Sequence, residues 1–82
     1  MNKLEILAKV EEYFENEYNI LCYSLKNCEW TKSNPQRFIH QSMASCCAIV
    51  MFCQDLGVEY EPLDALYQPY YEKMFKMLRN YH

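Results

Sequence analysis

The sequence predicts an all-α domain spanning residues 1–82, built as a bundle of three helices. Three observations lead to this fold class. Apolar residues recur at helical spacing over most of the chain. The 82 residues include only one glycine and three prolines, too few for the many turns of an all-β domain. Hydrophobic residues make up 51% of the chain and aromatic residues 16%, a composition that disordered chains lack.

The first predicted helix covers about residues 3–28. Its apolar residues recur at spacings of three, four or seven, which places them on one side of a helix. They are Leu4, Leu7, Phe14, Tyr18, Leu21, Leu25 and Cys28. Charged and amide side chains occupy the other side, so the helix is amphipathic. Residues 29–34 are polar apart from one tryptophan, and we predict a loop there.

The second predicted helix covers about residues 35–56 and has clear signals at both ends. Asn34 precedes Pro35, and asparagine is a favoured N-cap while proline is favoured at the first helical position. Gly57, the single glycine, lies where a helix end requires a left-handed residue. Val58 then supplies the apolar contact that accompanies a Schellman end.

The third predicted helix covers about residues 62–81, beginning at Pro62 with Asp64 in its first turn. Pro69 lies inside this segment, where it removes a backbone hydrogen bond and crowds the preceding turn. The helix is therefore either kinked near Pro69 or broken into a short turn followed by a helix. Of these alternatives we favour a single kinked helix.

The second helix carries no charge between residues 43 and 53 and is apolar on all sides. Two of its stripes would pack on the neighbouring helices: Ile39, Met43, Cys46, Val50 and Cys53 form one, and Phe38, Ile49, Phe52 and Leu56 form the other. The third side contains Ala44, Cys47, Ala48 and Met51. Two neighbours cover only part of a helix, so these residues are the candidate interface of a symmetric homodimer, a larger bundle. In the alternative, the other helices enclose this one in a monomer.

Metal binding is disfavoured by the spacing of the candidate ligands, and thiol catalysis by the surroundings of the cysteines. The residues of ligand type are Cys22, Cys28, His40, Cys46, Cys47 and Cys53. Ligands on one helix normally lie one turn apart, whereas Cys46 and Cys53 would be about 10.5 Å apart along the axis. The mid-helix cysteines lack a cation or base that would lower the thiol pKa. We therefore predict no catalytic residues, no metal and no cofactor.

Two alternative functions have some support in the sequence. Glu12 with Glu15, and Glu61 with Asp64, are acidic pairs of the kind that hold magnesium in all-α nucleotide phosphohydrolases. The second and third helices, joined at Gly57, could form a small DNA-binding regulator, but the third begins with an acid and no cation. The net charge of −3 gives no basic patch for nucleic acid.

The leading functional hypothesis is a non-enzymatic helical module for protein–protein interaction or assembly. Tyr60 and Tyr71 are candidate docking residues, because tyrosine suits surfaces that are partly packed and partly wet. The five cysteines and the charged first residues indicate free thiols in the reducing cytoplasm, without an export signal. No apolar stretch reaches the roughly 20 residues that span a membrane, so we expect no membrane partner.

Overall fold

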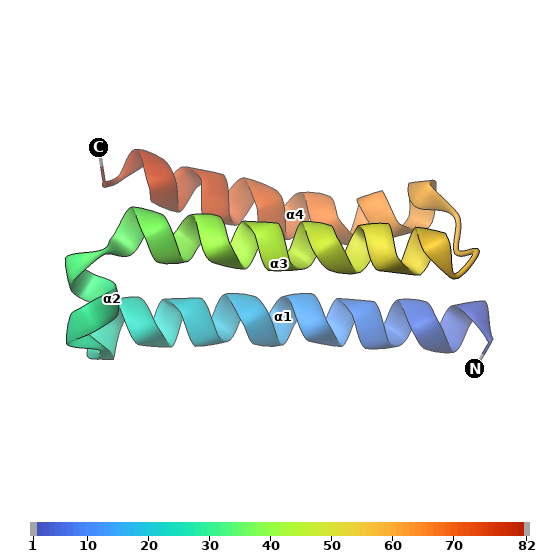
Figure 1. The fold of residues 1–82 in the computed structure, drawn as a ribbon, viewed down its shortest axis with the longest axis horizontal. Coiled ribbons are helices and arrows are strands. Elements are labelled where there is room, and N and C mark those ends of the chain that lie inside the picture. Colours follow the sequence, from blue (N-terminus) through green and yellow to red (C-terminus); the bar gives the residue numbers. More distant parts are fainter. Residues whose placement is uncertain (1, 82) are drawn as a thin grey trace.

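The computed structural model describes residues 2–81, which form four helices and, within that range, no strand. They are α1 (Lys3–Asn27), α2 (Glu29–Ser33), α3 (Pro35–Asp55) and α4 (Tyr60–Arg79) (Figure 1). The predicted all-α class is confirmed, and the three long helices lie within two residues of their predicted bounds. The predicted count of three helices is incomplete, because α2 is a further short helix.

α1 begins at a reciprocal cap formed by Asn2 and Glu5. The Asn2 side-chain oxygen accepts a hydrogen bond from the Glu5 backbone N–H at 2.9 Å, and its Nδ2 donates to Glu5 Oε1 at 2.9 Å. The first of these bonds satisfies the Glu5 N–H, a first-turn donor that has no partner inside the helix. α1 ends at Asn27 because Cys28 takes up an extended conformation, with φ −105° and ψ 117°.

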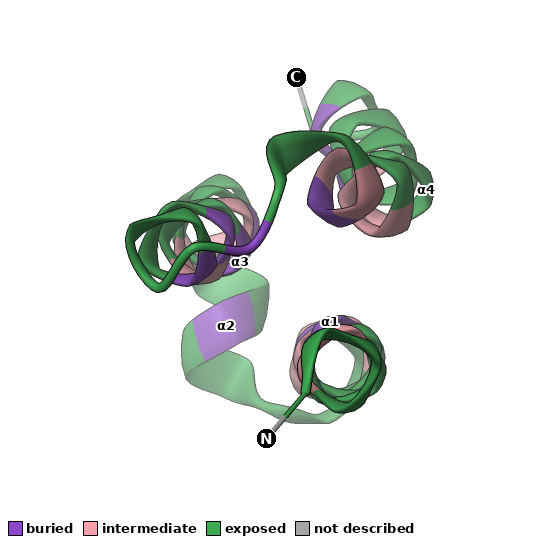
Figure 2. Ribbon diagram, turned by 90° about the vertical axis from the view of Figure 1, so that its right-hand side faces the viewer, coloured by how far each residue is buried: buried purple, intermediate pink, exposed green. Residues whose placement is uncertain are grey.

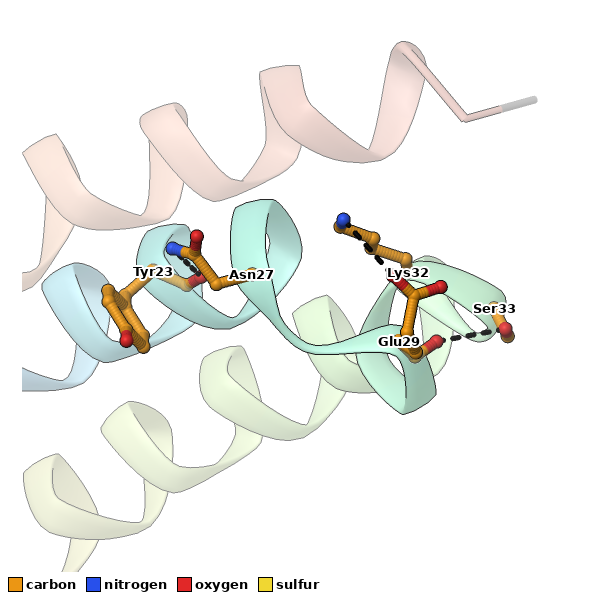
Figure 3. A network of polar contacts seen from close by, with 5 residues as sticks. All are labelled: Tyr23, Asn27, Glu29, Lys32 and Ser33. Carbon is orange, nitrogen blue, oxygen red and sulfur yellow. Dashed lines mark hydrogen bonds and ion pairs between the residues drawn. The ribbon is translucent and has the colours of Figure 1, made fainter.

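The predicted loop at residues 29–34 is wrong for its first five residues, which form α2. Local contacts hold this turn: Lys32 Nζ lies 3.3 Å from Glu29 Oε1, and Ser33 Oγ donates to the Glu29 carbonyl at 2.9 Å (Figure 3). Thr31 is buried, so the helix also packs on its neighbours. α2 carries the chain across from the end of α1 to the start of α3 (Figure 2).

α3 begins at Pro35 as predicted, but the predicted side-chain cap from Asn34 is wrong. Asn34 Nδ2 instead donates back to the Trp30 carbonyl at 3.0 Å, so this side chain closes α2. The Asn34 backbone carbonyl still accepts from Phe38 N–H at 3.3 Å. The helix start therefore depends on Pro35, whose missing N–H would have no helical partner in the first turn.

The end of α3 is the predicted Schellman arrangement. Gly57 has φ +93°, and its N–H donates to the Gln54 carbonyl at 2.9 Å. The Val58 N–H donates to the Cys53 carbonyl at 3.0 Å, and the Val58 side chain is buried in the core. Glycine is required because a positive φ brings Cβ of other residues close to the backbone.

Gly57→Ala is expected to lower the free energy of unfolding by about 1 to 2 kcal/mol, the cost of a left-handed alanine. Apart from Gly57 itself and its two chain neighbours, nothing lies within 4 Å of the position that a Cβ would occupy, so the loss comes from the local backbone conformation and not from a clash with the rest of the protein. Urea denaturation measures it. Gly57→Asn is the control, because asparagine tolerates positive φ better and should lose less. Equal losses in the two variants would contradict this explanation.

α4 begins two residues earlier than predicted and continues unbroken through Pro69. Pro62 falls within the first turn, where backbone N–H groups have no helical partner, so the helix can extend in front of it. Pro69 has no backbone N–H, so the carbonyl of Ala65 lacks its helical hydrogen-bond donor. Both residues are exposed. Water can satisfy that carbonyl, which explains why the alternative of a broken helix is wrong.

The core lies along the axis of a triangle formed by α1, α3 and α4 (Figure 2). Each of these helices packs on the other two. The largest fully buried side chains are Phe14, Ile39, Leu63, Met74 and Cys46. The Phe14 ring centre lies 5.7 Å from that of Tyr67 and 6.0 Å from that of Tyr70. An aromatic cluster therefore packs α1 against α4. The side of α3 that does not face the core is exposed to solvent.

Candidate interaction surface

The side of α3 that faces away from the core is formed by the four predicted interface residues Ala44, Cys47, Ala48 and Met51. All four are exposed, and Met51 retains 61% of its accessible surface. The core-facing side of the same helix is buried, at Ile39, Ser42, Cys46, Val50 and Cys53. The protein's own helices therefore leave this outer face of α3 uncovered, within the described residues.

Two residues predicted to pack inside the bundle also lie on the surface. Phe52 is 59% exposed and Leu56 is 62% exposed. The prediction that this stripe is covered by a neighbouring helix is wrong for both, because α1 covers only the part of α3 nearest the core. Phe52 and Leu56 instead line an open, largely apolar groove with Ile6, Val10 and Tyr13 of α1.

The candidate docking tyrosines lie beside the outer face of α3. A shallow groove between α3 and α4 is lined by Cys47 and Met51 on one side and by Tyr60 and Tyr71 on the other. These two groups of residues were identified separately in the sequence. The antiparallel packing of α3 and α4 brings them together at one surface (Figure 1).

Both tyrosines are positioned by contacts with other residues of α4. Tyr60 Oη donates to Asp64 Oδ1 at 3.1 Å, and this bond to the carboxylate raises the pKa of the Tyr60 phenol. The Tyr71 ring lies 5.8 Å from that of Tyr67 and 5.9 Å from that of Phe75. Burial raises the pKa of Tyr67 to about 12. Tyr67 is thus a packing residue, whereas the rings of Tyr60 and Tyr71 remain accessible.

Sequence reasoning missed Phe75, which is exposed and extends the aromatic row of α4. Its ring stacks on Tyr71, four residues earlier, and the Arg79 guanidinium lies 5.5 Å from its centre. The spacing 71, 75, 79 was available in the sequence, because residues four apart are neighbours on a helix surface.

The acidic pairs do not converge. Glu12, Glu15 and Glu61 are exposed. Asp64 is engaged locally, because it accepts from Tyr60 Oη and from Gln68 Nε2 at 3.0 Å. Among residues 2–81, no three His, Cys, Asp or Glu side chains lie close enough together to hold a metal ion. The structure therefore does not bring Glu12, Glu15 and Asp64 into one coordination sphere.

The five cysteines are free and occupy different environments. Burial raises the pKa of Cys46 to about 12, and it also raises the pKa of Cys53. Cys28, at the junction of α1 and α2, is exposed. Hydrogen bonds from the Thr31 side chain and backbone lower the pKa of Cys28 by stabilising its thiolate.

Cys28 is expected to react with a thiol reagent well before Cys46 and Cys53 near pH 8. Its lowered pKa gives a larger thiolate fraction at that pH, and the thiolate is the nucleophile. Burial raises the pKa of Cys46 and Cys53, which lowers their thiolate fraction, and it also shields both thiols from the reagent. Mass spectrometry of peptides after timed labelling measures the order. Labelling of Cys46 as fast as Cys28 in the folded protein would contradict the packing described above.

Comparison with protein-family models, with curated proteins and with solved structures found no match to this chain. Within the described residues, no helix is both long enough and apolar enough to cross a membrane.

Proposed function

We propose that this chain is a non-enzymatic helical interaction module that assembles as a homodimer through the outer face of α3. The observation that carries the proposal is the exposure of Ala44, Cys47, Ala48 and Met51 on a helix without charge from residue 43 to residue 53. An uncharged apolar helix face is unfavourable in water and gains free energy when another surface covers it.

The size of the chain supports the same proposal. Its accessible surface is 5663 Å², whereas a monomer of this mass typically exposes about 5,200 Å². Small domains bury a low fraction of their apolar surface, so a second copy would add stability that one core supplies only marginally. Two-fold closure is the commonest arrangement for such self-association.

The edge of the outer face fits the anatomy of an interface. Interfaces have an apolar centre and a more polar rim, and tyrosine is enriched in interfaces relative to the rest of a protein surface. Tyr60 and Tyr71 flank Cys47 and Met51 across the α3–α4 groove, and we assign them to this rim. Five cysteines with no pairing suit a reducing compartment, and we place the module in the cytoplasm on that ground.

Sedimentation equilibrium of the full chain, from low to high micromolar concentration, tests the proposal. The expected result is a reversible shift from the chain mass of 10.0 kDa toward twice that mass. The melting temperature should rise with concentration over the same range, because association stabilises the folded chain. A single species of the chain mass at every concentration would overturn the proposed function.

A further inference from the structure

The outer face of α3 continues toward both ends of the helix as a regular stripe. Its members are Arg37, Gln41, Ala44, Ala48, Met51 and Asp55, all of them exposed. Successive members are alternately four and three residues apart, which is the heptad spacing of helices that pack along a shared seam. We call these six residues the outer stripe.

The outer stripe is symmetric about residue 46. Arg37 lies as far before this point as Asp55 lies after it, and the same holds for Gln41 with Met51 and for Ala44 with Ala48. Arg37 and Asp55 are 18 residues apart, which amounts to about five turns and about 27 Å along the helix. They therefore lie on the same side of α3, one near each end.

Arg37 and Asp55 also have the signs that the helix dipole disfavours. Arg37 is in the first turn and Asp55 is the last residue, and α3 has no acid in its first turn and no cation in its last. Cations are favoured at the C-terminal end and anions at the N-terminal end. Neither residue forms an ion pair with another described residue. A single chain thus gains nothing from this placement of the two charges.

We propose that two copies of α3 pack antiparallel along the outer stripe, with a two-fold axis near residue 46. This inference rests on the proposed function and specifies its geometry. Arg37 of each copy then meets Asp55 of the other, so two ion pairs close the ends of the interface. Each charge also comes next to the end of the other copy's helix that its sign favours. A parallel pair would instead place Arg37 against Arg37 and Asp55 against Asp55.

The centre of the outer stripe is suited to this arrangement. Antiparallel pairing places Ala44 of one copy opposite Ala48 of the other, on both sides of the axis. Interaxial distance depends on the side chains at the contact and ranges over about 8–10 Å. Where the two copies of α3 cross, alanine side chains are small enough to allow an interaxial distance at the shorter end of that range. Met51 and Gln41 then meet between the alanines and the charged ends.

Charge reversal tests the orientation. Arg37→Asp and Asp55→Arg each turn two attractive pairs per dimer into repulsive ones, and each should raise the dissociation constant of the dimer roughly tenfold at low salt. The double variant restores opposite charges at both ends and should return to within about threefold of the original value. Sedimentation equilibrium measures all three. Each substitution supplies the sign that the helix dipole favours, so helix loss does not explain a weakened dimer.

Lys76→Asp, at an exposed position on α4, makes the same change in net charge as Arg37→Asp and is the control. It should leave the dissociation constant within about threefold. If the chain dimerises but the single reversals change nothing, or the double variant is weaker than either, the antiparallel register is wrong and the proposed function stands. If the unmodified chain stays monomeric throughout, the proposed function fails and the register fails with it.

Discussion

Ala48→Glu is expected to raise the dissociation constant of the dimer by about 100-fold or more, leaving monomers at micromolar concentration. In a single chain this position is exposed, so the glutamate is hydrated and the fold is retained. In the proposed dimer it faces Ala44 of the second copy, where a carboxylate loses water and finds no cation. Burial of an unpaired charge costs several kcal/mol. Sedimentation equilibrium measures the loss, and circular dichroism checks that helix content is unchanged.

Ala65→Glu is the matched control for this variant. Ala65 is an exposed alanine of α4, and the change in size and charge is identical. This variant should dimerise with a dissociation constant within about threefold of the original, because surface changes away from an interface have small effects. If Ala48→Glu dimerises as tightly as Ala65→Glu, the outer face of α3 is not the interface.

Phe14→Ala is expected to lower the free energy of unfolding by about 3–5 kcal/mol, the range for a fully buried phenylalanine. Phe14 has no exposed surface and packs against both Tyr67 and Tyr70, so its removal leaves a cavity where α1 meets α4. A chain of this length is stable by about 4–12 kcal/mol, and the variant would lose a large part of that. Urea denaturation at fixed protein concentration measures the difference.

The control for the core substitution is Ile20→Ala. Ile20 lies on the same helix but is exposed, so its truncation should cost less than about 1 kcal/mol. The comparison separates loss of packing from loss of helix propensity, because both variants place alanine inside α1. A Phe14→Ala variant no less stable than Ile20→Ala would contradict the described core.

The ends of α3 were predictable because their signals are local and chemically specific. Pro35 fits a first turn and few other helical positions, and Gly57 is the residue that a left-handed helix end requires. The long amphipathic pattern of α1 was sufficient to predict that helix, because one face carries the apolar residues and the other carries the charges.

α2 was missed because five residues are too few for a periodic pattern. α2 is stabilised by the hydrogen bond from Ser33 Oγ to the Glu29 carbonyl and by the burial of Thr31. The spacing of residues in the sequence does not show that these contacts form. The role of Asn34 was wrong for a related reason. Its amide could cap the following helix or bond backward to the Trp30 carbonyl, and both are local options for asparagine.

The candidate interaction surface was predictable only as separate parts. The apolar excess of α3 identified Ala44, Cys47, Ala48 and Met51, but it did not say how far around the helix α1 would reach. Phe52 and Leu56 were therefore assigned to the interior, although both are exposed. The proximity of Tyr60 and Tyr71 to this face depends on how α4 packs against α3, a long-range contact that residue spacing does not encode.

Timed thiol labelling of Cys47 at several protein concentrations tests most directly whether a second copy covers the outer face of α3. Cys47 is exposed in the single chain and lies beside Ala48, whereas Cys28 lies at the junction of α1 and α2 and serves as the internal reference. In the proposed dimer the second copy shields Cys47, so Cys47 is expected to react several-fold more slowly, relative to Cys28, as the protein concentration rises through the dissociation constant. A ratio of the two labelling rates that stays constant from low to high micromolar concentration would contradict it.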